Sequence, residues 1–338
     1  MSGSSHGGGI VRDAGSREER PLSTEIGKEI SKARALLEHG LLVAIPTETV
    51  YGLAANALNA DAVLRIFEVK ARPTFDPLIV HGASREALEA YVATFPEWAR
   101  QLADRFWPGP LTLILPKKPI IPDIVTSGLD TVAVRVPRHA MTLGLLEELG
   151  LPLAAPSANP FGYISPTTPQ HVMDQLGGKI SYILDGGPCG VGIESTIVGE
   201  RNGKIVILRL GGLAASEIEQ VIGPVEIDIS STSDPTAPGK LESHYAPRTP
   251  LLFGPITLVG RDPLRVGVIA FQTLPEGLPD GHGIALSPHG DTHEAAKGLF
   301  AAMRTLDALD LDIILAEPMP ETGLGPAMND RLRRAMAR

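Results

Sequence analysis

Several features that mark particular classes of protein are scarce in this chain of 338 residues. Its one cysteine, Cys189, excludes an intrachain disulfide and suits a reducing compartment. No apolar run approaches the roughly 20 residues of a membrane-spanning helix. Aromatic residues make up only 4% and the formal net charge is −9, which argues against a surface devoted to nucleic acid. We therefore expect a cytoplasmic protein that makes no contact with a membrane, while a local basic cleft stays possible.

The first twenty residues lack the apolar core of about 7–15 residues that a secretory signal needs. We expect residues 1–20 to form a flexible leader. The rest has an ordinary globular balance, with 43% hydrophobic and 20% charged residues. Its length suits about two domains.

Apolar patterns over residues 21–222 predict a single α/β domain with a mixed sheet. Ser23–His39, followed by Gly40, has the spacing of an amphipathic helix, and Asn59–Val69 has that of a second helix with Asn59 as its N-cap. The pair Asn202-Gly203 indicates a hairpin. Strands are predicted at Leu41–Ile45, Leu78–His81, Leu111–Leu115, Val132–Val136, Pro152–Ala155, Ile180–Leu184, Ser195–Val198 and Ile205–Leu210.

The pattern changes at about Gly223, where prolines become frequent and no period persists. Residues 223–250 are therefore predicted to be a linker. Beyond it, strands and helices alternate, which predicts a small Rossmann-like α/β domain over residues 251–338. Its predicted elements are strands at Arg265–Phe271, Gly283–Leu286 and Leu311–Ala316 and helices at Thr292–Leu306 and Pro326–Ala337.

Polar side chains follow two of the predicted strands. Thr47, Thr49 and Tyr51 come after the first strand, and Ser157 and Asn159 come after Pro152–Ala155. Ligands of open α/β sheets tend to bind beyond strand ends, so these groups are candidates for a polar ligand. The same residue types also stabilise turns by bonding the nearby backbone. The fragments alone leave both interpretations open.

Three cations stand at informative places. Lys70 and Arg72 close the second helix, where they either complement the helix dipole or clamp a phosphate. Arg135 lies inside a strand whose neighbouring valines face the core. A buried Arg needs a partner, which is either a ligand carboxylate or an internal Asp or Glu.

Other patterns indicate less. The glycine-rich segment Asp185–Thr196 fits neither standard nucleotide loop, although its backbone amides could approach an anion, and Cys189 within it is expected to be a bystander. His289 and His293 flank Asp291 at a helix start, where an N-cap is a simpler interpretation than a metal site. Neither a Ser–His–Asp pattern nor a paired-carboxylate motif is evident.

Five motifs, taken in order, carry a family resemblance: PTETVYGL, KARPTFDPLIVH, VAVRVP, AAPSANPFG and GIESTIV. Together they resemble the YrdC-type threonylcarbamoyl-AMP synthases. APGKLESHYAPRTPL and the terminal α/β unit resemble the longer, two-domain subclass, so the resemblance covers roughly residues 23–338. It implies a YrdC-like twisted mixed-sheet domain with a concave cleft. The implied activity is synthesis of L-threonylcarbamoyladenylate from L-threonine, bicarbonate (as CO2) and ATP, with release of pyrophosphate, for N6-threonylcarbamoyladenosine in tRNA.

The resemblance also implies roles for individual residues. At the ATP phosphates, with Mg2+ bridging their oxygens, it places the tetrad Lys70, Arg72, Ser157 and Asn159. Further nucleotide contacts are implied for Thr131, Ser165 and Arg209, with Tyr245 as a cover. The implied threonine site comprises Thr47, Thr49, Tyr51, His81, Arg135, Ala155 and Ser195. Asp76 stands where relatives often carry Asn and is a candidate near the triphosphate, although no protein side chain is firmly expected as a metal ligand.

The expected partner is a downstream transferase that receives the adenylate, with tRNA contact at most indirect. One alternative is a carbamoyl-adenylate-handling enzyme with another acceptor. Such enzymes resemble larger chains with zinc-finger segments, which a lone cysteine does not support. Another is a non-catalytic RNA-binding protein, against which the acidic charge and sparse aromatics count.

Overall fold

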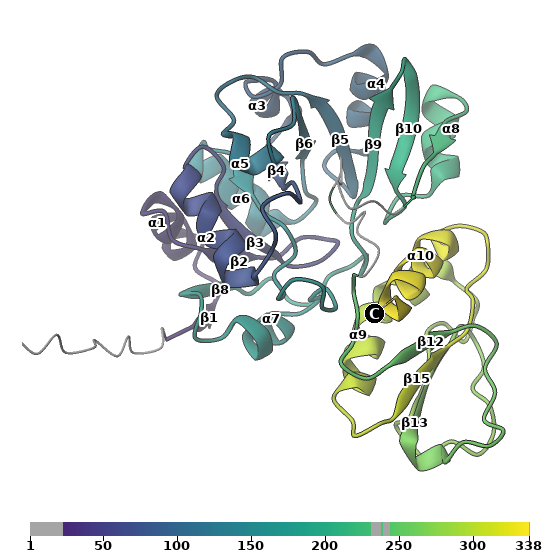
Figure 1. Ribbon diagram of the computed structural model, residues 1–338. Coiled ribbons are helices and arrows are strands. Elements are labelled where there is room, and N and C mark those ends of the chain that lie inside the picture. The colour runs from purple at the N-terminus through teal and green to yellow at the C-terminus, as the bar shows by residue number, and fades with distance from the viewer. Residues whose placement is uncertain (1–22, 231–237, 239–243, 338) are drawn as a thin grey trace, which may run out of the picture.

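The computed structural model describes residues 23–230, 238 and 244–337. These residues form a large domain around an eleven-stranded sheet and a small domain around a four-stranded sheet (Figure 1). The predicted leader and much of the predicted linker lie outside the described residues. The predicted division at residues 20, 222 and 250 stays a prediction.

The large sheet has the order β1-β8-β2-β3-β7-β4-β6-β5-β9-β10-β11. Its strands are β1 (Glu25–Gly27), β2 (Val43–Ile45), β3 (Gly52–Asn56), β4 (Ile79–His81), β5 (Leu111–Pro116), β6 (Thr131–Arg135), β7 (Leu153–Ala154), β8 (Tyr182–Leu184), β9 (Thr196–Arg201), β10 (Lys204–Arg209) and β11 (Glu226–Ile227). Parallel pairs such as β4–β6 alternate with antiparallel pairs such as β5–β6, so the sheet is mixed as predicted. This architecture confirms the expected fold class.

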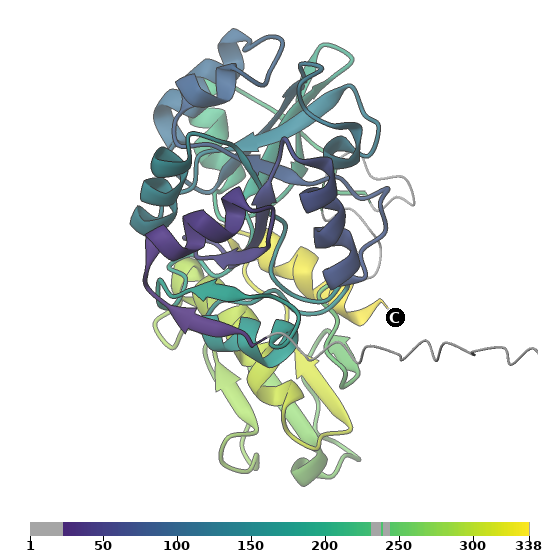
Figure 2. The same cartoon turned by 90° about the vertical axis from the view of Figure 1, so that its left-hand side faces the viewer.

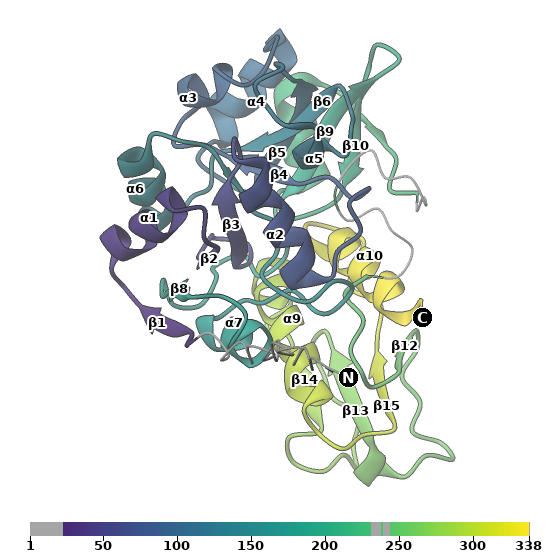
Figure 3. The ribbon, with the colours of Figure 1, turned by 60° about the vertical axis from the view of Figure 1, so that its left-hand side comes forward.

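Helices cover both faces of this sheet because successive strand residues point to opposite sides. Val43 and Ile45 of β2 pack with α1 and α6, whereas Ala44 packs in the larger cluster with α2 and α4. The helices are α1 (Ile30–Glu38), α2 (Ala60–Lys70), α3 (Arg85–Glu89), α4 (Glu97–Phe106), α5 (Asp123–Thr126), α6 (Ala140–Leu149), α7 (Pro169–Leu176) and α8 (Ala215–Ile222). Figure 3 shows α1 and α6 side by side, with α2 beside β3.

The small domain has a parallel sheet of order β12-β15-β13-β14, as its alternating pattern predicts. Its elements are β12 (Leu251–Phe253), the short 3-10 helix η1 (Pro263–Arg265), β13 (Val266–Ala270), β14 (Gly283–Ala285), α9 (Thr292–Asp307), β15 (Ile313–Ala316) and α10 (Gly325–Met336). Figures 1 and 2 show α9 and α10 on the side that faces the large domain, with the small sheet beyond them. Two helices of the small domain thus lie against the large one.

One local prediction was wrong, and one segment contains a short strand that was not predicted. The helix predicted over Ser23–His39 begins only at Ile30, because Glu25–Gly27 pairs with Tyr182–Leu184 as strand β1. The predicted linker contains strand β11, which pairs with β10. Both short strands depend on partners distant in the sequence, which local periodicity does not report.

The predicted hairpin is confirmed. Asn202 and Gly203 connect β9 to β10 with φ of 54° and 76°, the left-handed values that such a two-residue turn requires. None of the helices among the described residues combines the length and apolar character needed to cross a bilayer.

Candidate active site

The strand order brings several loop ends to one edge of the large sheet. His81 and Arg135 end the parallel strands β4 and β6 and are register partners. Because β5 is antiparallel to β6 and parallel to β9, the start of β9 lies at the same edge. The segment after β7 joins them, since Ser157 bridges Gly52. Side chains from separate parts of the sequence therefore meet here.

The loop after α2 holds Arg72 firmly. Its guanidinium donates to the carbonyl oxygens of Asp76 (3.2 Å) and Pro77 (3.0 Å) and lies 2.9 Å from Asp76 Oδ2. Asp76 is fully buried, and burial raises the pKa of its carboxyl although Arg72 and Lys70 oppose the shift. Neither of its carboxylate oxygens has a hydrogen-bond partner among the described residues. Arg72 is thus fixed by its own loop and pairs with a carboxylate that retains free lone pairs.

Lys70 lies behind this loop, and its ammonium group is almost fully buried. It donates to the carbonyl oxygen of Ser157 (2.6 Å) and to that of Asn159. Burial, with Arg72 nearby, holds the pKa of Lys70 well below its usual range. Lys70 therefore connects the loop after α2 to the loop after β7.

Arg135 has an internal partner, which answers the question that its strand position raised. Its Nη2 lies 2.8 Å from Glu48 Oε1 and donates to Thr49 Oγ1 at 3.0 Å. Thr47 Oγ1 lies 2.8 Å from the same hydroxyl. His81 is buried beside this group, and burial together with Arg135 lowers its pKa to about 3, so its ring is neutral at physiological pH. The result is a polar recess with one guanidinium and several neutral hydrogen-bonding groups.

The opposite wall is built around Glu194 and Arg209. Ser165 Oγ donates to Glu194 Oε1 at 2.5 Å, and Arg209 donates to the carbonyl oxygen (3.0 Å) and hydroxyl (3.1 Å) of Ser195. Burial lowers the pKa of Arg209 to about 10, which keeps it charged near neutral pH. Thr112 Oγ1 lies 2.7 Å from the Ser195 hydroxyl.

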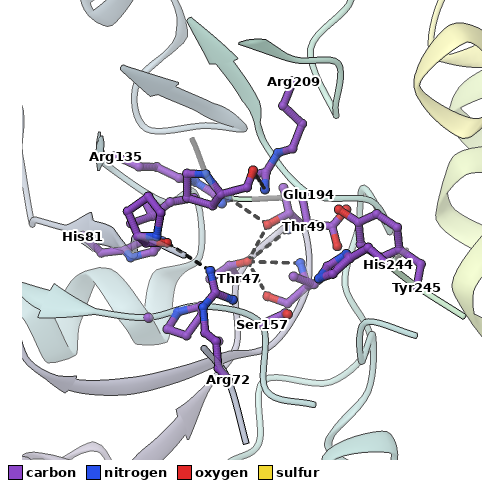
Figure 4. Close-up of a pocket in the computed structure, with 17 residues that line it drawn as sticks. Thr47, Thr49, Arg72, His81, Arg135, Ser157, Glu194, Arg209, His244 and Tyr245 are labelled. Atoms are coloured by element: carbon purple, nitrogen blue, oxygen red, sulfur yellow. Dashed lines mark hydrogen bonds between the residues drawn. The ribbon is translucent and has the colours of Figure 1, made fainter. Parts of the chain in front are cut away.

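Two aromatic side chains from the segment between the domains close the site. Tyr245 is fully buried, stacks on Phe300 of α9 with ring centres 5.4 Å apart, and has a φ of 63°. The His244 ring meets Tyr245 edge-on at 4.0 Å, and burial holds the pKa of His244 well below its usual range. Figure 4 shows both rings beside the small domain, across the pocket from His81.

Many of these groups line one pocket, which Arg72, Arg135 and Arg209 approach from different sides (Figure 4). The lining residues are Thr47, Thr49, Val50, Gly52, Arg72, Pro77, Ile79, His81, Arg135, Ala155, Pro156, Ser157, Glu194, Arg209, Pro238, His244 and Tyr245. Three guanidinium groups around a buried recess favour anionic ligands such as carboxylates and phosphates. The pocket is chemically suited to bind and orient anions.

Comparisons with known proteins point to one family. A family model described as "Telomere recombination" matches residues 35–211, and one described as "Threonylcarbamoyl-AMP synthase, C-terminal domain" matches residues 213–337. The threonylcarbamoyl-AMP synthase of Pyrococcus abyssi is 45% identical over 91% of this chain and 94% of its own length. That of Bacillus subtilis is 43% identical over 91% and 92%. The chain belongs to the threonylcarbamoyl-AMP synthase family.

Solved structures agree with this threonylcarbamoyl-AMP synthase assignment. The crystal structure of P. abyssi Sua5 complexed with L-threonine has a TM-score of 0.84 and 42% identity. The match covers 93% of this chain and 97% of that one. The similarity therefore includes both domains and confirms the two-domain subclass.

The structure brings most of the residues predicted for a threonylcarbamoyl-AMP synthase site to the pocket or directly behind it. The predicted residues that line it are Thr47, Thr49, Arg72, His81, Arg135, Ala155, Ser157, Arg209 and Tyr245. Those that do not line it are Lys70, Asp76, Asn159, Ser165, Ser195, Tyr51 and Thr131. Hydrogen bonds or ion pairs connect five of these to lining residues or to the loops that carry them, namely Lys70, Asp76, Asn159, Ser165 and Ser195. Tyr51 donates to the carbonyl oxygen of Gly187 at 2.7 Å. Thr131 lies at a separate small cavity beside Ile114.

Glu48, Glu194 and His244 were missed as site residues. Glu48 lies within the first motif, Glu194 within GIESTIV and His244 beside Tyr245, so their motifs were available as signals. At the small domain, Asp291 accepts a hydrogen bond from the His293 amide at 2.8 Å, which confirms the N-cap interpretation. The metal interpretation finds no support, because no cluster of three or more His, Cys, Asp or Glu occurs among the described residues.

Proposed function

We propose that this chain synthesises L-threonylcarbamoyladenylate from L-threonine, bicarbonate (as CO2) and ATP. The observation that carries the proposal is the convergence of Arg72, Arg135 and Arg209 on one buried pocket. A threonine carboxylate and an ATP triphosphate together need several positive partners in a confined space. The membership of the chain in the threonylcarbamoyl-AMP synthase family supports this substrate set.

In the first step, the threonine amine attacks the carbon of CO2. A carbon–nitrogen bond forms, one proton leaves the nitrogen, and a carbamate results. We assign the threonine carboxylate to Arg135, whose geometry is fixed by Glu48 and Thr49. A pKa of about 3 keeps the His81 ring neutral at physiological pH. We therefore assign His81 as a hydrogen-bond acceptor for the amino acid and not as a residue that holds its proton. Thr47, Thr49, Ala155, Tyr51 and Ser195 complete the assigned threonine site.

In the second step, a carbamate oxygen attacks the α-phosphorus of ATP, and the bond to the pyrophosphate oxygen breaks. Arg72 and Arg209 neutralise charge on the phosphates, while Lys70, Ser157 and Asn159 organise the loops around them. Thr131, Ser165 and Tyr245 keep the nucleotide roles that the family resemblance implies. Positioning and charge neutralisation are the main contributions, since no protein nucleophile is required.

Mg2+ is part of the proposal as a companion of the triphosphate. Protein-bound Mg2+ with nucleotides usually takes one or two carboxylates together with phosphate oxygens. Asp76 is the candidate carboxylate, because it lies beside Arg72 directly behind the pocket lining and retains lone pairs unused by the described residues. Mg2+ bound there would neutralise phosphate charge.

The segment carrying His244 and Tyr245 must withdraw before ATP enters. The pocket leaves about 50 Å³ of free space with both rings in place. On this measure one water needs about 10–15 Å³, so only a few waters fit. A segment that then closes over the nucleotide would exclude water, which protects a labile carbamate.

The adenylate product must then reach a separate transferase that modifies tRNA. We propose that this transferase is the macromolecular partner and that tRNA contact with this chain is at most indirect. The product is a reactive mixed anhydride, so its consumer must accept an activated carbamoyl group.

The test is pyrophosphate release from ATP by the full chain with bicarbonate and Mg2+, in the presence or absence of L-threonine. We expect threonine-dependent release and a product with the mass of threonylcarbamoyl-adenylate. The variant Arg72→Ala should lose this release while keeping its fold by circular dichroism. ATP binding without threonine-dependent release would refute the proposal in favour of another acceptor. Binding of RNA without ATP turnover would favour the non-catalytic alternative.

A further inference from the structure

Two arginines of the small domain reach the pocket wall from behind. Arg331, on α10, has no exposed surface, and its Nε lies 3.1 Å from Glu194 Oε2. Arg304, on α9, donates to the backbone carbonyl oxygens of Ser165 (3.3 Å) and Ile164. Both therefore act on the large domain from outside it.

These two arginines contact the two residues that share one hydrogen bond, Ser165 and Glu194. Ser165 Oγ donates to Glu194 Oε1, while Arg331 pairs with the other oxygen of the same carboxylate. Arg304 fixes the backbone that carries Ser165. Glu194 itself lines the pocket, whereas neither arginine does.

Arg331 also contacts a second lining residue. Its guanidinium carbon lies 5.3 Å from the centre of the Tyr245 ring, a cation–π arrangement. A second carboxylate, Asp330 on the same helix, lies 2.9 Å from Arg331 Nη1 and helps to fix the guanidinium. Among the described residues Arg331 Nη2 has no hydrogen-bond partner. The ion pairs of Arg331 with Glu194 and Asp330 must therefore offset the free-energy cost of burying its charge.

The charge of Glu194 makes this pairing important for anionic ligands. A carboxylate in the wall of a buried pocket repels phosphate and carbamate groups, because screening by water is weak there. The ion pair with Arg331 cancels that charge and leaves the carboxylate in a single orientation. Without Arg331, Glu194 would lose its ion-pair partner and would draw on the charge of Arg209, which the proposed function reserves for the phosphates.

We propose that Arg331 is a positioning residue of the synthase site and that the small domain, through Arg331 and Arg304, keeps Glu194 and Ser165 in the form that accepts ATP. This inference rests on the proposed function. It gives the small domain a direct part in the reaction site, distinct from covering it.

The test is a double-mutant cycle between Arg331→Met and Glu194→Gln in the full chain, measuring KM for ATP, kcat, and ATP affinity by calorimetry. In the chain that keeps Glu194, Arg331→Met should raise KM and Kd for ATP by about tenfold or more. In the chain that already carries Glu194→Gln, the same change should raise them by less than about threefold, because no charge is left to neutralise. An equal loss in both backgrounds would overturn the proposal.

Two controls separate positioning from general stability. Tyr163→Phe removes another interdomain hydrogen bond, the one to Asp307 Oδ2, without touching Glu194. Arg333→Gln changes an exposed arginine on α10. Both should keep the wild-type KM for ATP at a temperature where every variant is folded. If Tyr163→Phe raises KM as much as Arg331→Met does, the effect is structural and the proposal fails.

If Arg331→Met does not fold, Arg331→Lys replaces it. Lysine keeps the charge that neutralises Glu194, so KM for ATP should rise by less than about threefold. A rise of about tenfold or more with the charge retained would overturn the proposal. A wild-type chain without threonine-dependent pyrophosphate release would instead refute the proposed function itself.

Discussion

Three buried arginines at or behind the site form ion pairs with carboxylates from the same chain. Arg72 pairs with Asp76, Arg135 with Glu48, and Arg331 with Glu194. An unpaired buried charge is costly, so each internal carboxylate keeps its arginine in place before a ligand arrives. An anionic ligand at Arg72 or Arg135 therefore meets a guanidinium that is already oriented, and it shares that group with an internal partner.

The variant Arg135→Met tests whether Arg135 contributes both to threonine binding and to the stability of the fold. It should abolish detectable threonine binding, and it leaves Glu48 as a buried carboxylate without its partner. The free energy of unfolding should therefore fall by about 3–5 kcal/mol. Calorimetric titration with L-threonine and urea denaturation measure the two effects.

The double variant Glu48→Gln/Arg135→Met separates these effects. It should recover much of the lost stability, because no unpaired charge remains, but it should not recover threonine binding. Recovery of threonine binding would show that Arg135 does not hold the amino acid.

At the residue scale the sequence predicted which side chains gather at the pocket better than how they are paired. Arg135 was recognised as needing a partner, but the choice between a ligand and an internal carboxylate stayed open. The deciding residue, Glu48, is distant in the sequence and reaches Arg135 only through the strand order. Asp76 was noticed as a departure from relatives, while its pairing with Arg72 depends on the path of one loop.

At the element scale, β10 has a glycine at each end, and the two glycines differ in how much room an added side chain would find. Gly203, at the hairpin tip, has no atom within 4 Å of an added Cβ but has a φ of 76°. Gly211, just beyond the strand, would place a Cβ 2.3 Å from the carbonyl oxygen of Glu194 and 2.4 Å from the carbonyl carbon of Ser195. Gly203 is needed for its left-handed backbone conformation, whereas Gly211 is needed because its backbone lies against that of Glu194 and Ser195.

The variants Gly203→Ala and Gly211→Ala should therefore differ in kind. Gly203→Ala should cost about 1 kcal/mol of stability through its left-handed backbone and leave kcat/KM unchanged. Gly211→Ala should displace the Glu194–Ser195 backbone and lower kcat/KM by about tenfold or more. Denaturant melts and pyrophosphate-release kinetics on both variants check this, and equal activities would contradict the assigned role of Glu194–Ser195.

Elements with strong local signals were predicted, and those that depend on distant partners were not. The turn at Asn202-Gly203 and the cap at Asn59 are encoded by adjacent residues, and both are confirmed. The strand β1 was mistaken for a helix because Ile26 continues the helical spacing of α1. Strand β3 and helices α3 to α8 were not predicted. Of these, α3 and α5 have only 5 and 4 residues, whereas α4 and α6 have 10 residues each and were overlooked despite their length.

At the scale of the whole molecule, α9 makes close contacts with the large domain in addition to those of Arg331 on α10. Phe300 stacks on Tyr245, Asp307 accepts from Tyr163, and Arg304 donates to the Ser165 backbone. At Gly192 the large domain approaches the α9 backbone so closely that an added Cβ would lie 2.4 Å from Lys297 Cα. Docking of the small domain therefore requires a residue without a side chain at this position.

Gly192→Ala should loosen this docking, because the methyl group meets helix backbone and the φ of 83° disfavours alanine. We expect a decrease in melting temperature of roughly 5–10 °C, two resolved transitions in calorimetry, and a higher KM for ATP as Arg331 and Arg304 lose their positions. Gly190→Ala is the matched control, since no atom lies within 4 Å of its added Cβ. If both variants melt in one transition at the wild-type temperature, the domains do not depend on this contact. If Gly192→Ala melts in two transitions while its KM for ATP is unchanged, the small domain does not support the site through docking, and the role inferred for Arg331 fails with it.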